Sequence, residues 1–215
     1  MWAACSPYRA GFITSMAAVA GAVAQEILAC YEQPGIDRAW VNNGGDIALH
    51  LAPGQSITVG VYADIAALNA AQLRNGLVLD GKIRIDSAMP VRGVATSGWR
   101  GRSQSLGIAD SVTVLARTAA QADAAATIVA NAVDVADARI VRRPAWQVRD
   151  DSDLGAIPVT VDVPALPKEL VGRALHQGLQ KAQELQSSGL LWFALLACQG
   201  PVSYTHLTLP TKRIV

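Results

Sequence analysis

The stretch from Val94 to Asp134 constrains the fold more than any other part of the sequence. A loop rich in glycine and arginine leads into a strand-like run, Ser111–Ala116, and then into an alanine-rich segment that predicts a helix over 119–133. The chain is 51% hydrophobic but only 5% aromatic, and its apolar residues are mostly alanine and valine. We therefore expect thin helices packed closely on a sheet, with few aromatic side chains in the core.

Strand and helix patterns alternate along the rest of the chain. Small residues predict a helix over 13–31, and a strand, a tight turn and a second strand follow over 38–51. The remaining predicted elements are an amphipathic helix over 167–187 and strands over 56–62, 82–87, 156–163 and 190–197, with a polar, Ala-rich connection between the first two strands. Since several strands are linked as hairpins, we expect an α+β fold with helices packed on a mainly antiparallel or mixed sheet.

The two ends of the sequence differ from its middle. From residue 201 the text PVSYTHLTLPTKRIV loses the alanine and valine bias, so we expect 201–215 to be an unrelated or artefactual tail. Residues 1–200 have the length and apolar content of a single domain. Near the N-terminus, AVA-Q before residue 26 resembles a signal-peptidase site, but the pattern continues to Leu28 and so favours an amphipathic helix.

Charge and cysteine content argue against several function classes. The net charge of +1 gives no electrostatic case for binding nucleic acid or an anionic membrane surface. No run approaches the roughly 18 apolar residues of a membrane span. The three cysteines (Cys5, Cys30 and Cys198) are far apart and lack metal-ligand spacing, so we expect a reduced, cytoplasmic setting. The three histidines are equally scattered, which gives no support to a zinc site or a catalytic triad.

The segment NNGGDIAL, residues 42–49, contains the first candidate site residues. Gly44 and Gly45 allow a ligand to approach the backbone closely, and their N–H groups can bind phosphate oxygens. Asp46 can bind a metal ion or a ribose hydroxyl. Taken alone, these residues are explained better as an ordinary hairpin turn. The segment is neither a P-loop nor a GxGxxG fingerprint.

The loop SGWRGRS, residues 97–103, contains the second group. Arg100 and Arg102, with Arg92 upstream, can form a bidentate clamp on a phosphate or carboxylate. Trp99 can stack on a planar ring. A solvated loop whose arginines only keep it soluble is an equally good interpretation. No GxSxG sequence is present, so a serine nucleophile is not expected here.

Asp123 and Thr127 form the third group. They lie four residues apart on the predicted helix, so both side chains point to one face about one turn apart. Carboxylate and hydroxyl oxygens suit Mg²⁺, which also keeps several waters. The alternative, preferred for the isolated pair, is an aspartate that favours the helix dipole and a routine helical threonine. A weaker acidic group is expected to cap a turn; it comprises Asp150, Asp151 and Asp153.

In this order, the pieces resemble the ApbE-like superfamily. The resemblance rests on a small-residue AGA helix, N-x-GGD-I, Ser97-Gly98, and VTVLA followed by ADAAAT, and it extends from about residue 12 to 200. Founding members are flavin transferases that move FMN from FAD onto protein threonines. The chain looks closest to a shorter branch for which no activity is established.

The resemblance implies a site. Asp123 and Thr127 match the Mg²⁺ ligands of the transferases, the helix over 16–26 would lie beside the flavin nucleotide, and residues 44–46 would help to shape the pocket. With the loop residues above, the expected ligand-binding set is Gly44, Gly45, Asp46, Ser97, Gly98, Arg100 and Arg102.

The chain departs from the transferase pattern in several places. It has Ala20-Gly21 where the transferases have a Lys-Gly pair, and Gln25 where they have an aspartate. The histidine segment of their reaction centre is missing, because the same interval here is only SGWRGRSQSLGIAD. This loss argues against FMN transfer more than against nucleotide or metal binding. The upstream strands that complete such a pocket are also not found, so we expect the domain to lack them.

Two functions from different classes remain open. The first is a Mg²⁺-dependent enzyme that transfers FMN from FAD or hydrolyses FAD, with the arginines orienting the nucleotide; no catalytic residue is assigned. The second is a protein that binds a flavin or another nucleotide without turnover. A fragment that only folds and forms a homodimer through its Ala-rich helices is also compatible with the sequence.

Overall fold

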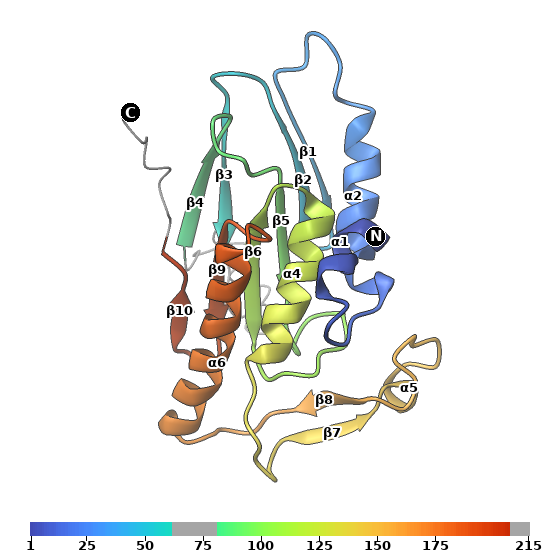
Figure 1. Cartoon of the computed structure of the whole chain (residues 1–215), viewed down its shortest axis with the longest axis vertical. Coiled ribbons are helices and arrows are strands. Elements are labelled where there is room, and N and C mark those ends of the chain that lie inside the picture. Colours follow the sequence, from blue (N-terminus) through green and yellow to red (C-terminus); the bar gives the residue numbers. More distant parts are fainter. Residues whose placement is uncertain (62–80, 207–215) are drawn as a thin grey trace, which may run out of the picture.

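A six-stranded sheet forms the centre of the computed structural model, which describes residues 1–61 and 81–206 (Figure 1). All the neighbouring strands are antiparallel, in the order β1 (Arg38–Asn43), β2 (Asp46–Leu51), β5 (Gly93–Ser97), β6 (Ser111–Ala116), β9 (Phe193–Ala197) and β10 (Val202–Tyr204). Two hairpins add small sheets, β3 (Ser56–Val61) with β4 (Gly81–Asp86) and β7 (Val141–Pro144) with β8 (Pro158–Asp162). The expected α+β fold with a mainly antiparallel sheet is confirmed.

Both faces of the central sheet are covered. Three helices, α2 (Val19–Ala29), α4 (Ala119–Ala132) and α6 (Lys168–Ser187), lie on one face (Figure 1). The β3–β4 hairpin packs on the other, where Ile85 meets Leu115 of β6 in a second core cluster. Every residue of β6 is buried. A strand that is covered on both sides needs apolar residues without strict alternation, which explains the VTVLA run.

Helix α4 is packed closely against its neighbours because glycines face it. A Cβ added at Gly21 of α2 would lie 2.3 Å from the carbonyl oxygen of Ala119. One added at Gly107 would lie 2.1 Å from the carbonyl oxygen of Ala130, at the other end of α4. Backbones therefore touch at both ends of the helix. Its inward residues are almost all alanine, as the sequence led us to expect.

Several elements differ from those expected. Strand β5 lies in part of the stretch that was assigned to a loop, and β7 and helix α5 (Ala145–Val148) were not expected. The first predicted helix begins as a 3-10 turn, Ser15–Ala18, and becomes α-helical at Val19. Two further short helices lie near the N-terminus, α1 (Trp2–Cys5) and a 3-10 turn, Ser6–Tyr8. The connection expected between β3 and β4 lies outside the described residues.

The C-terminal segment from residue 201 is described as far as His206, and it joins the sheet edge. Strand β10 pairs with β9, and the buried Thr205 hydroxyl accepts a hydrogen bond from the Ala194 N–H at 3.0 Å. The unrelated or artefactual origin of residues 201–215 stays a prediction. Among the described residues, no helix combines the length and apolarity that crossing a membrane requires.

Candidate functional site

The candidate residues gather at one end of the central sheet. There the β1–β2 turn, the end of β5 and the start of β6 meet. Asn43 pairs with Asp46, which leaves Gly44 and Gly45 as a two-residue turn with φ of 70° and 114°. A turn of this kind needs positive φ at both central positions, and glycine adopts it without strain. The hairpin is confirmed, and the same turn also lines a cavity.

A cavity of about 730 Å³ lies at this end of the sheet. Its walls include β3 residues from Val59 to Val61 on one side and the β5–β6 loop on the other. Its volume falls within the range of about 300–1,000 Å³ that is usual for small-molecule sites. The structure brings to this one cavity the whole ligand-binding set that the sequence put forward: Gly44, Gly45, Asp46, Ser97, Gly98, Arg100 and Arg102.

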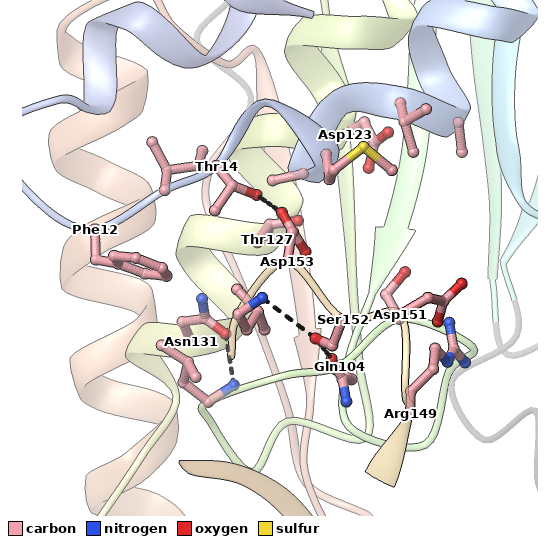
Figure 2. Close-up of a pocket in the computed structure, with 18 residues that line it drawn as sticks. Phe12, Thr14, Gln104, Asp123, Thr127, Asn131, Arg149, Asp151, Ser152 and Asp153 are labelled. Carbon is pink, nitrogen blue, oxygen red and sulfur yellow. Dashed lines mark hydrogen bonds between the residues drawn. The ribbon is translucent and has the colours of Figure 1, made fainter. Parts of the chain in front are cut away.

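A second cavity of about 240 Å³ adjoins the first, on the helix side of the sheet. Asp123 and Thr127 of α4 line it, together with Thr14 from the segment before α2 and the loop after α5 (Figure 2). Residues that line both cavities mark the boundary between them; they are Ala20, Ser103 and Arg149. The two predicted metal ligands therefore lie beside, and not within, the cavity of the predicted nucleotide-binding residues.

Asp123 contacts the start of a neighbouring helix. The Gly21 N–H, in the first turn of α2, donates to Asp123 Oδ2 at 2.9 Å. This satisfies one of the unpaired N–H groups at the α2 terminus. The alternative role in the first turn of its own helix is wrong, because α4 begins at Ala119 and has no acidic residue in that turn. The Thr127 hydroxyl, one turn further along α4, makes no hydrogen bond to another described residue.

Asp46 and Asp123 are buried carboxyl groups on the two sides of the boundary, and both have raised pKa values. Burial raises the pKa of the Asp123 carboxyl to about 7, and the Asp46 carboxylate adds to the rise, against the N–H groups of Gly21 and Ala20. Burial likewise raises the pKa of Asp46 to about 6, against the Thr96 N–H, 3.2 Å away, and Arg102. Carboxyl groups with such pKa values in a cavity are typical of functional sites.

We predict that this pair makes the protein less stable as pH rises. Both carboxyl groups have folded-state pKa values above the usual 3.8, so the folded chain binds more protons than the unfolded chain between about pH 4 and 7. The contribution is complete below about pH 4 and is lost as pH passes 6 to 7. Urea unfolding should show a fall of more than about 1.4 kcal/mol, the equivalent of one pKa unit, between pH 5 and 8.

A matched variant tests the cause of that fall. Asp46→Asn removes one of the two titrating groups and should flatten the profile between pH 5 and 8. An Asp46→Asn profile as steep as that of the wild type would show that other groups cause the pH dependence.

The arginines expected to form a clamp have separate roles. Arg100 pairs with Asp110, with Nε 2.8 Å from Oδ1, and its guanidinium lies 5.1 Å from the centre of the Trp99 ring. Arg92 lines neither cavity. Its guanidinium donates to the backbone carbonyls of Ser87, Met89 and Val91. The predicted part of Arg92 in the clamp is therefore wrong. Trp99 packs against the main core and lines neither cavity, so it offers no stacking platform there.

The loop 149–154 is a part of the site that the sequence did not reveal. Asp153 accepts a hydrogen bond from the Thr14 hydroxyl, and Ser152 donates to Gln104 (Figure 2). Arg149 donates to the Arg102 carbonyl at 2.7 Å. The expected turn is present, but the side chain that caps it is Ser152 and not an aspartate: the Ser152 hydroxyl oxygen accepts a hydrogen bond from the Leu154 N–H. The partners are far away in sequence, so only the acidic composition of the loop could have indicated it.

The donor set for a metal ion is small. No group of three or more His, Cys, Asp or Glu side chains suited to a metal occurs in the described part of the chain. Asp123 and Thr127 thus offer a carboxylate and a hydroxyl at the edge of an open cavity. This incomplete set fits Mg²⁺, which is usually held by one or two carboxylates with phosphates and waters completing its shell. It does not fit a zinc ion, which takes four protein ligands in structural sites.

Comparison with known proteins gives a consistent result. The family model described as AbpE bacteria matches residues 1–204. A UPF0280 protein from Methanopyrus kandleri is 37% identical over 150 residues, which cover 69% of this chain and 54% of that protein. A UPF0280 protein from Methanospirillum hungatei is 36% identical over 137 residues, covering 62% and 50%. The aligned part spans about half the length of these relatives.

Proposed function

From the premise that the chain belongs to the AbpE bacteria family, we propose that its two adjoining cavities bind a dinucleotide of the FAD class together with Mg²⁺. One observation carries this proposal. Residues suited to phosphates and residues suited to a cation line neighbouring cavities that share a boundary. A pyrophosphate with a bound divalent cation needs such an arrangement.

The charges of the two cavities support the same assignment. Three arginines and two aspartates line the larger cavity: Arg100, Arg102, Arg149, Asp46 and Asp110. The smaller one has three aspartates (Asp123, Asp151 and Asp153) and a single arginine, which the two cavities share. Phosphate oxygens are attracted to the first set and a cation to the second. The pyrophosphate would therefore lie at the boundary, near Ala20 and Ser103.

The residues that line the two cavities would each have a role in holding this ligand. Asp123 and Thr127 would hold Mg²⁺, which when bound neutralises charge on the pyrophosphate oxygens. Arg102 would orient the phosphates, and the glycine turn would let them approach the backbone closely while its Gly45 N–H stays bonded to Asn42 Oδ1. Apolar side chains of the larger cavity, Ile47, Val59 and Val94, would contact the planar ring system and exclude water from it. Asp123 can act as a ligand while it caps α2, because the two oxygens of a carboxylate together accept about four contacts and the neighbouring N–H groups of Gly21 and Ala20 use only part of them.

A thermal-shift experiment tests this function. We expect FAD with Mg²⁺ to raise Tm more than FAD alone, FMN with Mg²⁺ or ATP with Mg²⁺. A ligand at about 100 times its Kd stabilises a protein by about 2.7 kcal/mol. For a chain of this size, that is a rise of about 5–11 °C. The absence of a shift with any flavin or nucleotide, with or without Mg²⁺, would overturn the proposed function.

The same samples separate binding from turnover. FMN released into solution over several hours, followed by chromatography, would assign FAD hydrolysis. FMN that becomes bound to added protein threonine would assign transfer. Bound FAD that stays intact over the same period would assign a binding protein, which the lost histidine segment favours.

A further inference from the structure

We infer that Arg102 and Arg149 together form a clamp at the boundary of the cavities that favours ligands with two linked phosphates over those with one. This inference deepens the proposed function and rests on it for the identity of the natural ligand. Arg149 lies outside the ligand-binding set that the sequence put forward. It nevertheless lines both cavities, which places it where a pyrophosphate would lie.

The two arginines are linked to each other and to the glycine turn. Arg149 Nη2 donates to the Arg102 carbonyl oxygen at 2.7 Å. The Arg102 guanidinium lies against Gly44, since a Cβ added at that glycine would be 1.8 Å from Arg102 Nη2. The glycine turn therefore leaves the space that the guanidinium fills. This contact places the Arg102 guanidinium against the turn, whose Gly45 N–H donates to Asn42 Oδ1 at 2.9 Å.

Neither guanidinium forms a close ion pair within the described part of the chain, although Arg102 lies near enough to Asp46 to lower its pKa. Arg100, Arg139 and Arg142 each pair with an aspartate. Arg102 and Arg149 form no such ion pair there, although Asp151 lines the smaller cavity with Arg149. A guanidinium has five N–H donors in a planar fork that matches two oxygens of one phosphate. Two such forks match two phosphates.

The loop that carries Arg149 is held in place. On one side, Asp153 accepts a hydrogen bond from the Thr14 hydroxyl. On the other, the Ser152 hydroxyl donates to the side-chain oxygen of Gln104 (Figure 2). The loop follows α5, whose first residue, Ala145, accepts a hydrogen bond from Gln104 Nε2 at 2.9 Å. Anchoring on both sides reduces the entropy lost when Arg149 binds a ligand.

Calorimetric titration with inorganic pyrophosphate and with orthophosphate, at a fixed Mg²⁺ concentration, tests the clamp without a flavin. Wild type should bind pyrophosphate more tightly than orthophosphate. Arg149→Ala should weaken pyrophosphate binding by about 10- to 100-fold, the usual effect of losing a charge-assisted contact. Orthophosphate binding should weaken by less than about threefold. Arg149→Lys, which keeps the charge but not the fork, should lie between.

Arg143→Ala is the matched control, because Arg143 lies on the adjacent strand β7, is exposed and lines neither cavity. It should leave both affinities unchanged, and circular dichroism should show that all variants fold. Equal affinity of Arg149→Ala and wild type for pyrophosphate would overturn the clamp, as would an equal loss for both anions or no pyrophosphate binding by wild type. Pyrophosphate binding without FAD binding would instead overturn the proposed function and leave the clamp standing.

Discussion

Replacing Asp123 with asparagine is expected to remove the Mg²⁺-dependent part of FAD affinity, a loss of about 10- to 100-fold, while the chain still folds. The amide oxygen of asparagine can accept the Gly21 N–H that Asp123 Oδ2 now accepts. The negative charge that would attract the cation is lost. Asp151 and Asp153 also line the smaller cavity, but they belong to no metal-binding group of three or more side chains in the described part of the chain, so they and Thr127 should not retain the ion.

The measurement is a pair of FAD titrations for each variant, one with saturating Mg²⁺ and one with a chelator. Asp137→Asn is the matched control, since it makes the same substitution at a half-buried residue that pairs with Arg139 and lines neither cavity. The control should keep the full Mg²⁺ effect. An Asp123→Asn chain that gains as much affinity from Mg²⁺ as wild type would remove Asp123 from the metal site.

Replacing Gly21 with alanine should cause a large loss of stability. The new methyl would lie 2.3 Å from the Ala119 carbonyl oxygen and 2.6 Å from its carbon, both backbone atoms that cannot move alone. Helices α2 and α4 must then separate, at a cost of roughly 1–3 kcal/mol for overpacking. In a chain of this size the cost corresponds to a fall in Tm of about 2–12 °C. Calorimetry would measure it.

Gly172→Ala provides the control for this substitution. Gly172 lies on the exposed side of α6, and a Cβ there would meet nothing within 4 Å. Alanine at such a position stabilises a helix by roughly 0.5–1 kcal/mol, so Tm should rise slightly. If Gly21→Ala also raised Tm, the close approach of α2 and α4 would be wrong.

Local patterns in the sequence predicted the elements that determine the fold. Strand β6 has the bounds expected from its apolar run, and α4 ends within one residue of the prediction. The start of α4 is marked by Thr118, whose hydroxyl oxygen accepts a hydrogen bond from the Gln121 N–H at 3.2 Å. The glycine turn between β1 and β2 was equally readable, because two adjacent glycines suit a turn that needs positive φ.

Elements whose signal lies far away in the sequence were missed. Strand β5 is five residues long, and its sequence is typical of a loop. It forms a strand because it pairs with β2 on one side and with β6 on the other. The site depends even more on distant contacts. Asp46 and Asp123 are far apart in sequence, yet the Asp46 carboxylate raises the pKa of Asp123. Arg149 reaches the site only through a loop held by Thr14 and Gln104.

Calorimetric titration of FAD into the wild-type chain, with and without saturating Mg²⁺, tests the central claim most directly. Joint binding across the two cavities predicts one FAD for each chain and an affinity that Mg²⁺ tightens by at least about tenfold, equivalent to about 1.4 kcal/mol. FAD binding of equal affinity with and without Mg²⁺, or no FAD binding at all, would contradict it.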